Sequence, residues 1–401
     1  MKNDKIINKC AVCKSDSLEL VVSLPDYPMN TVYLINKDNE SNFGTRNMQL
    51  FCCPICNHFQ AKSDLTPKDL YNDDYQYFTQ NPGVQGRIKF FLKQLEPLRH
   101  IRFNRIIDIG CFDLSLLKEL KKEFYANTFI GIDPSIPKNL VNNIDGIICY
   151  KNYTDNIKLP DSKSDLPDLI ISDQTFEHIP GIDSSLKNFT SQLSDNLYFA
   201  VCVPSLEVLI EKLNFHNLIH EHVNYFSIHT LTRLFENSGL FLNSYTIEYK
   251  TSCGFLFAIY SSKSNLPKNN CIQLLDDNIY TRKYFLSYYE TFKNMLSICK
   301  KILSEERGGV IYGFGASDIT ANLAYFMDSD FSMLDVILDE TEYKKNTYYP
   351  FLKPMIVNPK DYIVKKGAVC LITAPQAARY IYNKLIDSEF KKIINPLGVI
   401  S

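Results

Sequence analysis

Two pairs of cysteines near the start of the chain have the spacing of zinc ligands. The segment "CAVC" contains Cys10 and Cys13, and "CCPIC" contains Cys53 and Cys56. Each C-x2-C turn presents two thiolates to one tetrahedral ion, and four thiolates leave no open position for catalysis. We therefore predict a structural Zn²⁺ site in a small β-rich module that depends on the metal for folding.

Two neighbouring side chains, Cys52 and His58, are alternative ligands for the same ion. The alternative to a metal site is a set of reduced thiols in a small core. If the site holds zinc, we expect loss of the metal to unfold this module while the rest of the chain stays folded.

A second group of chemically active residues is a histidine-rich segment, "FHNLIHEHVNYFSIHT". It holds four of the seven histidines, namely His216, His220, His222 and His229. It lacks the H-E-x-x-H spacing of a metalloprotease. A histidine beside a carboxylate, here His222 beside Glu221, is a candidate general base because imidazole titrates near neutrality. His178, in "TFEHIPG", follows an expected strand and is a second candidate. The alternative is a polar loop that joins two domains.

The segment "RIIDIGCFDLSLLKEL" has the pattern of a strand, a glycine turn and a helix. Gly110 follows the apolar strand, and we expect the helix to begin near Asp113, so that the turn presents N–H groups to a ligand. In "FIGIDPS", Asp133 ends the next strand, at about the distance at which an acid meets a ribose in such folds. The pattern predicts a nucleotide-type cofactor site.

Two more carboxylates at strand ends, Asp108 and Asp173, complete the candidate cofactor residues. Phe112 and Leu114 stand where nucleotide folds have glycines, and their side chains either crowd the cofactor or point back into the sheet. The alternative is a plain α/β turn that has lost its cofactor.

A second strand, turn and helix follows in "IYGFGASDITANL", with Gly313 and Gly315. Packing of a strand on a helix explains such a turn about as often as ligand binding. An oxidoreductase that binds a dinucleotide here is an open alternative, although no ribose acid is clearly placed beyond Asp339.

The alternation of short apolar runs with helical stretches predicts parallel α/β sheets. For the 401 residues we expect three domains, at 1–68, 69–264 and 265–401. A formal net charge of −2 gives no basic surface for a nucleic acid polymer, and no apolar run approaches the roughly 20 residues that span a bilayer. We expect a cytoplasmic monomer that does not bind membranes.

The order of these motifs, together with "YNDDYQYFT", "EHIPG" and "DVILDETEYKKNTYYP", resembles that of the sugar nucleotide C-methyltransferases over nearly the whole chain. The resemblance implies a class I methyltransferase Rossmann-like domain, flanked by an N-terminal zinc-binding module and a C-terminal Rossmann-like α/β domain. It implies an enzyme that uses S-adenosylmethionine (SAM) to methylate the carbon beside the keto group of a dTDP-linked keto-deoxysugar, in surface-polysaccharide or natural-product biosynthesis.

The resemblance also implies roles for single residues. It makes His222 the base, with Glu221 nearby and His178 facing the same cleft, while Tyr75 and Tyr77 cover the cofactor or the substrate. Because a C–H bond beside a ketone is weakly acidic, a positioned imidazole and hydrogen bonds to the enolate oxygen are both needed before carbon attacks the methyl group.

The chain departs from the family pattern in three places. Phe112 and Leu114 replace an asparagine and a glycine, Ile219 replaces a tyrosine that is thought to be the acid or the enolate partner, and Ser317 and Asp318 replace a small residue and a lysine. An alternative hypothesis is therefore a non-catalytic relative that binds a sugar nucleotide without using SAM.

Overall fold

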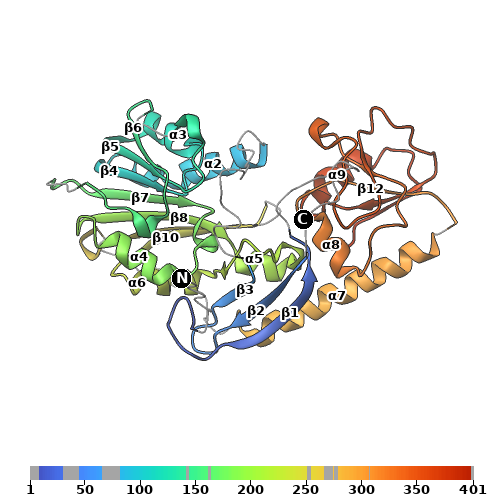
Figure 1. Ribbon diagram of the computed structural model, residues 1–401, viewed down its shortest axis with the longest axis horizontal. Coiled ribbons are helices and arrows are strands. Elements are labelled where there is room, and N and C mark those ends of the chain that lie inside the picture. The colour runs from blue at the N-terminus through green and yellow to red at the C-terminus, as the bar shows by residue number, and fades with distance from the viewer. Residues whose placement is uncertain are drawn as a thin grey trace.

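The chain forms three β-sheets in the computed structural model (Figure 1). The structure describes residues 9–29, 45–65, 82–140, 144–160, 164–250, 254–265, 274, 279–306 and 308–398. A seven-stranded sheet and a five-stranded sheet lie at opposite ends of the view in Figure 1, and the N-terminal sheet lies below them beside a long helix.

The central sheet has the strand order β10-β11-β8-β7-β4-β5-β6. Its strands are β4 (Arg102–Ile109), β5 (Tyr125–Ile132), β6 (Ile147–Tyr150), β7 (Asp168–Asp173), β8 (Leu197–Pro204), β10 (Phe241–Glu248) and β11 (Phe255–Ser261). All neighbours are parallel except β11, which runs antiparallel to both β8 and β10. This confirms the predicted parallel α/β sheet with an antiparallel pair at its edge.

Helices cover both faces of the central sheet, which is why a central strand such as β8 is apolar along almost its whole length. They are α2 (Pro82–Gln94), α3 (Ser115–Glu123), α4 (Ile182–Thr190) and α6 (Ile228–Glu236), whereas α5 (Leu206–Glu211) packs in a different buried cluster. Phe91 of α2 and Leu117 of α3 pack in the core of one face, and Leu186 of α4 and Phe235 of α6 pack in the core of the other. Helix α3 begins two residues after the predicted start, because the turn continues through Leu114.

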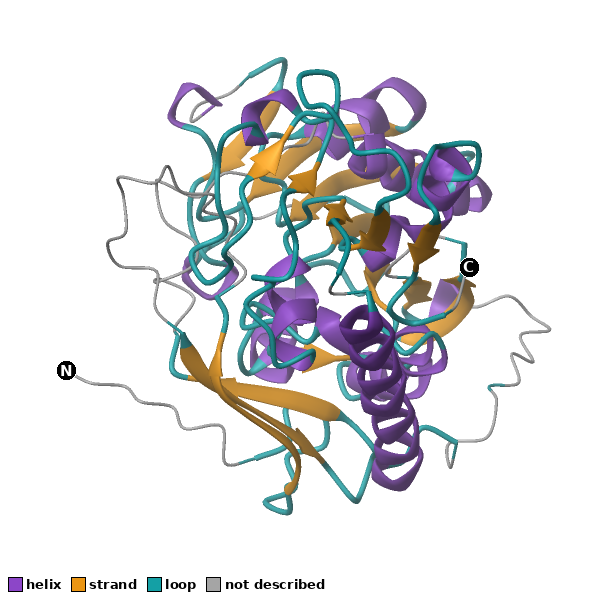
Figure 2. Ribbon diagram, turned by 90° about the vertical axis from the view of Figure 1, so that its right-hand side faces the viewer, coloured by secondary structure: helices purple, strands orange, loops and turns teal. Residues whose placement is uncertain are grey.

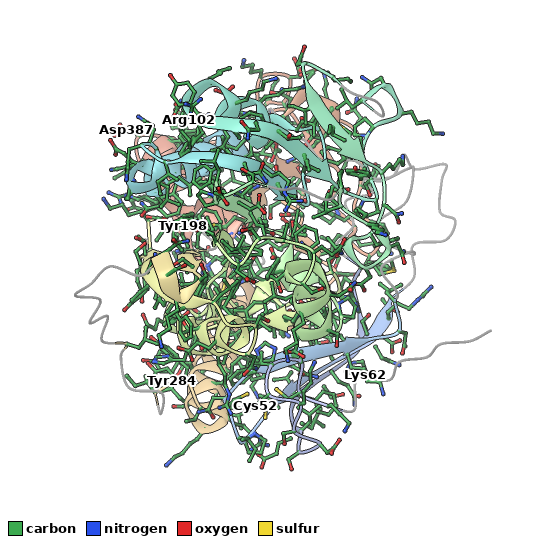
Figure 3. All side chains as sticks on the ribbon, turned by 90° about the vertical axis from the view of Figure 1, so that its left-hand side faces the viewer. Cys52, Lys62, Arg102, Tyr198, Tyr284 and Asp387 are labelled. Atoms are coloured by element: carbon green, nitrogen blue, oxygen red, sulfur yellow. The ribbon has the colours of Figure 1, made fainter. Side chains whose placement is uncertain are left out.

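The N-terminal sheet has the order β1-β2-β3-β9 and is antiparallel. Its strands are β1 (Glu19–Tyr27), β2 (Arg46–Cys52), β3 (Phe59–Ser63) and β9 (Asn224–Tyr225). The fourth strand comes from the histidine-rich segment, more than 160 residues along the chain, and pairs Tyr225 with Phe59. Figure 3 labels Cys52 and Lys62 on this sheet, at the opposite end of the molecule from Arg102. The sequence pattern did not indicate this pairing.

The C-terminal sheet is parallel, with the order β14-β13-β12-β15-β16. Its strands are β12 (Ile311–Phe314), β13 (Ile337–Leu338), β14 (Ile356–Val357), β15 (Val369–Ile372) and β16 (Lys392–Ile394). Its helices are α8 (Thr320–Phe326) and α9 (Ala378–Leu385), and the long helix α7 (Arg282–Glu305) precedes it. In Figure 2 the long helix α7 lies beside the N-terminal sheet.

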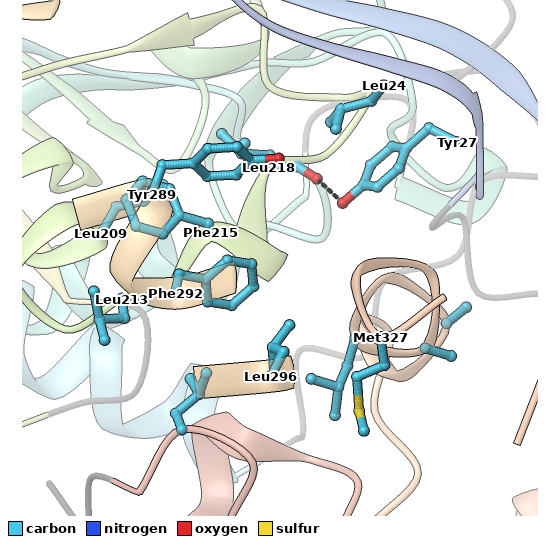
Figure 4. Close-up of a cluster of buried hydrophobic side chains, with 14 of the residues drawn as sticks. Leu24, Tyr27, Leu209, Leu213, Phe215, Leu218, Tyr289, Phe292, Leu296 and Met327 are labelled. Carbon is cyan, nitrogen blue, oxygen red and sulfur yellow. Dashed lines mark hydrogen bonds between the residues drawn. The ribbon is translucent and has the colours of Figure 1, made fainter. Parts of the chain in front are cut away.

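One buried apolar cluster joins the three parts (Figure 4). Leu24 of β1, Phe292 of α7 and Met327 beside α8 all belong to it. The hydroxyl of Tyr27 donates to the carbonyl of Leu218, 2.7 Å away, which lies between His216 and His220. The histidine-rich segment is therefore held from several sides. None of the helices in the described residues has both the length and the apolar character needed to cross a membrane.

Candidate functional site

The four predicted metal ligands lie together. The sulfurs of Cys10, Cys13, Cys53 and Cys56 all lie within 4.8 Å of one another, and the Cys10–Cys56 and Cys13–Cys53 sulfur pairs are each 3.5 Å apart. Sulfurs that share a tetrahedral zinc at about 2.3 Å lie roughly 3.8 Å apart. Cys52 is not part of this group, so the four cysteines of the two C-x2-C turns are the set that fits zinc.

The two C-x2-C turns have the same backbone geometry. The N–H of Lys14 donates to the carbonyl of Cys10, and the N–H of Asn57 donates in the same way to Cys53; Lys14 and Asn57 both have left-handed φ angles. A hydrogen bond from Cys56 lowers the pKa of Cys10 to about 4, whereas burial raises the pKa of Cys53 to about 11. A divalent cation would let all four thiols ionise.

The metal-ligand turns continue directly into contacts with the histidine-rich segment. After Cys56, the Nε2 of His58 lies 3.3 Å from the side-chain oxygen of Asn224, and the N–H of Ala61 donates to the carbonyl of Val223. The hydroxyl of Ser63 lies 2.9 Å from the Nδ1 of His220. The cysteine cluster thus lies next to strand β3, which pairs with the histidine-rich segment through β9.

The predicted cofactor turn, residues 110–114, follows β4. Gly110 has a φ of +85°, and a Cβ there would lie 1.9 Å from the hydroxyl of Thr175, so the position requires glycine. The N–H of Phe112 donates to one carboxylate oxygen of Asp133 at 3.1 Å, and the N–H of Ser135 donates to the other at 2.6 Å. The predicted ribose acid therefore also fixes the shape of the turn.

The two bulky residues of this turn differ in their burial. Leu114 is fully buried in the core against Gly131 and points into the sheet. Phe112 is partly exposed. Both have positive φ angles, 37° and 66°, so the turn keeps a glycine-like backbone without glycine, at a cost of about 1–2 kcal/mol per residue.

The other two predicted cofactor acids differ in their surroundings. Asp108 is buried, and burial together with the charges of Asp173 and Asp133 raises its pKa well above the usual value. Asp173 accepts two hydrogen bonds from Nε of Arg87, at 2.8 and 3.1 Å. Arg87 lies on α2, and sequence analysis missed it because a single arginine on a helix carries no motif.

The second glycine turn, residues 315–319, repeats the geometry of the first. The N–H of Ala316 donates to one oxygen of Asp339 at 2.7 Å, and the N–H of Thr341 donates to the other at 2.9 Å. Gly315 has a φ of +93°. Asp339 therefore occupies, after β13, the position that Asp133 occupies after β5 in the central sheet. The sequence alone had not clearly placed an acid for this second turn.

If the first turn holds the SAM that the sequence resemblance implies, replacing Asp133 by alanine should weaken SAM binding by about 1.5–3 kcal/mol, because a charged hydrogen-bond acceptor is lost. Calorimetry with the full chain measures this change. The matched control is Asp339→Ala, which removes the same two backbone contacts from the second turn and should leave SAM affinity unchanged. Equal losses in both variants would contradict the assignment of the cofactor to the first turn.

Two of the predicted catalytic histidines lie side by side. The rings of His178 and His222 are 4.9 Å apart, centre to centre, and the Nδ1 of His178 bonds the carbonyl of Glu221 at 2.9 Å. Burial lowers the pKa of His178 to about 4, and burial together with His178 lowers the pKa of His222 well below its usual value. Both imidazoles are therefore neutral near pH 7 and able to accept a proton.

Glu221 connects this pair to the C-terminal part of the chain. Burial and the like charge of Asp318, in the second turn, raise the pKa of Glu221 to about 7. The helix after the second turn also contacts the histidine-rich segment, because the side-chain amide of Asn322 donates to the carbonyl of His216 at 2.9 Å. The second turn and the histidine pair thus lie at one junction.

The remaining histidines have structural positions. His216 and His220 are fully buried, and His229 lies on α6. The sequence left two interpretations of the histidine-rich segment open, a loop that joins two domains and a site for a general base. The structure is compatible with both, because the segment contacts several parts of the chain and also contains His222. Beside Ile219, the hydroxyl of Tyr225 accepts a bond from the Ile219 N–H. Tyr75 and Tyr77 lie outside the described residues.

Comparisons with known proteins match two parts of the chain. Residues 77–244 match the family model of a methyltransferase domain, and residues 260–393 match that of a C-methyltransferase C-terminal domain. The C-methyltransferase NovU of Streptomyces niveus is 25% identical over 250 residues, which are 58% of this chain and 56% of NovU. The chain thus matches little more than half the length of that relative.

Two solved structures are similar to the chain in part. N-methyltransferase NodS from Bradyrhizobium japonicum, in complex with S-adenosyl-L-homocysteine, matches with 14% identity and a TM-score of 0.36, covering 48% of this chain and 93% of NodS. Magnesium protoporphyrin IX methyltransferase from Synechocystis, with the same ligand, has 14% identity and a TM-score of 0.35, covering 48% of this chain and 91% of that enzyme.

Proposed function

We propose that this chain, whose two parts match a methyltransferase domain and a C-methyltransferase C-terminal domain, is a C-methyltransferase that methylates a carbon beside the keto group of a nucleotide-linked keto-deoxysugar. The observation that supports the proposal most is the presence of two turns of nucleotide-binding type. In each of them a backbone N–H donates to an acid at the end of the next strand, Asp133 or Asp339. The second turn also adjoins the loop that contains the histidine pair.

In this proposal the first turn and Asp133 hold the adenosine of SAM. When bound, SAM supplies the electrophilic methyl group. The neutral imidazole of His222 removes the proton from the carbon beside the ketone, which gives that carbon the electron pair for attack on the methyl group. The His178 ring beside it is held by the carbonyl of Glu221, so the two imidazoles keep a fixed relation during proton transfer.

The second turn would hold the nucleotide of the substrate. Its N–H groups and Asp339 have the geometry that suits a ribose and a phosphate, and Asp318 lies near Glu221. A nucleotide on this turn could therefore extend its sugar toward His222. We further propose that the four-cysteine cluster holds a structural zinc ion and that the enzyme acts as a cytoplasmic monomer.

A non-catalytic relative that binds the sugar nucleotide alone is the second candidate. It is favoured by Ile219, since this residue offers only its backbone where the family has a tyrosine hydroxyl. It is disfavoured by Leu114, because the side chain of this residue is buried in the core and does not obstruct the first turn.

Calorimetry with SAM and with dTDP-4-keto-6-deoxyglucose as probes separates the two candidates. The methyltransferase should bind SAM in the micromolar range, or about −8 kcal/mol. Binding of the sugar nucleotide without any SAM binding at millimolar concentration would instead establish the non-catalytic relative.

A further inference from the structure

Glu177 is a buried carboxyl group with no role so far. It lies in the short helix η4 (Phe176–His178), and its side chain is 1% exposed. In the described part of the chain, neither of its carboxylate oxygens has a hydrogen-bond partner. A buried polar group in this state is costly and requires an explanation.

This carboxylate lies close to the histidine pair. Nε2 of His178 lies 3.7 Å from one oxygen of Glu177. Because the Nδ1 of His178 bonds the carbonyl of Glu221, that nitrogen carries the proton in the neutral ring and Nε2 faces Glu177 with its lone pair. Two such acceptors facing each other repel unless they share a proton.

The backbone holds this arrangement in place. The N–H of Val223 donates to the carbonyl of Glu177 at 2.8 Å, and the side-chain amide of Asn224 donates to the carbonyl of Phe176 at 3.2 Å. The helix η4 and the histidine-rich segment are thus fixed to each other. The distance between Glu177 and the histidine pair follows from these bonds.

We propose that Glu177 is a positioning residue whose carboxylate is the counter-charge for the imidazolium that forms when the pair of His178 and His222 accepts a proton. A proton on a buried imidazole is costly because the cation has lost its water, and an adjacent anion offsets that cost. The proposal rests on the proposed function for the use of this proton, but the pairing itself does not require a substrate.

Burial and the charges around Glu177 set the pH range in which this carboxyl group is ionised. Burial raises its pKa to about 8, with Asp173 raising it further and Arg87 lowering it. The pKa of His178 is lowered to about 4. Glu177 is therefore ionised and able to act as the counter-charge above about pH 8, while the His178 ring is neutral at any pH above about 4. Without the carboxylate, the histidine pair must become cationic with no counter-charge, so its proton affinity must fall.

The first test is a titration of histidine nitrogens by NMR in the full, SAM-free chain, with signals assigned through His178→Gln and His222→Gln. Because Nε2 of His178 lies 3.7 Å from Glu177, the histidine signals should show a transition near pH 8 as Glu177 ionises. Glu177→Gln is expected to remove this transition, and Glu177→Asp should keep it. The matched control is Glu207→Gln. Glu207 is equally buried but bonded to Ser205 and to the N–H of Ile228, so its replacement should leave the titration unchanged.

The second test measures solvent deuterium exchange at the carbon beside the ketone of dTDP-4-keto-6-deoxyglucose. Glu177→Gln should lower the exchange rate at least tenfold, flatten its pH profile near pH 8 and leave SAM affinity unchanged. Absence of exchange in the wild type would count against the proposed function alone, since the titration still tests the pairing.

Two outcomes would overturn the inference. One is an unchanged titration in both Glu177→Gln and Glu177→Asp. The other is a second divalent metal ion per wild-type chain that is lost in Glu177→Gln, because Glu177, His178 and His222 would then be metal ligands.

Discussion

Replacement of His222 by alanine is expected to lower the turnover of methyl transfer by about 10²–10⁴-fold and to leave SAM affinity unchanged. The imidazole lies beside His178, at the carboxyl edge of the central sheet, and burial keeps it neutral. It would act on the sugar rather than on the adenosine. Turnover and SAM binding, measured on the same preparation, check the two halves of this prediction.

Two further variants, Glu221→Gln and His178→Ala, test which residue removes the proton from the substrate. Glu221→Gln should cost less than His222→Ala, because the contact of Glu221 with His178 is made by its backbone carbonyl, which the substitution keeps. Solvent exchange that persists in His222→Ala but vanishes in His178→Ala would transfer the role of base to His178. Exchange that persists in both variants would contradict the assigned chemistry of the histidine-rich segment.

Replacement of Cys10 and Cys13 together by serine is expected to remove the zinc ion and also to abolish turnover. Structural zinc contributes on the order of 10–16 kcal/mol to the folding of small domains. Here the cysteine turn leads through Phe59 into β3, which pairs with β9 of the histidine-rich segment. Loss of the metal should therefore disorder the loop that carries His222, and not the N-terminal module alone as the sequence had led us to expect.

Elemental analysis, limited proteolysis and turnover test this prediction together. The matched control is Cys52→Ser, since Cys52 is buried beside the cluster but is not one of the four grouped cysteines. This variant should keep one zinc per chain and most of its turnover. A metal-free double variant with wild-type turnover would contradict the link between the cluster and the histidine segment.

The parts of this account that the sequence predicted depend on local patterns. The apolar runs of β4 and β5, the glycine turn at Gly110 and the spacing of the cysteines each lie within a short stretch, where periodicity and residue type determine the structure. The antiparallel edge strands were predicted for the same reason.

The parts that the sequence did not predict depend on contacts between distant residues. The two-residue strand β9 has no strand pattern of its own and exists because β3 offers a free edge. Arg87 and Glu177 carry no motif, and their roles follow from Asp173 and His178, which the fold brings to them. The direction of the Leu114 side chain depends on a left-handed backbone that leucine rarely adopts.

Transfer of an isotope-labelled methyl group tests the central claim most directly. The full chain would be incubated with SAM labelled in its methyl group and with dTDP-4-keto-6-deoxyglucose, and the product would be examined by NMR. We predict a labelled methyl group bonded to the ring carbon beside the ketone, formed by the wild type and not by His222→Ala. A label on oxygen or nitrogen, or equal labelling by both proteins, would contradict the account.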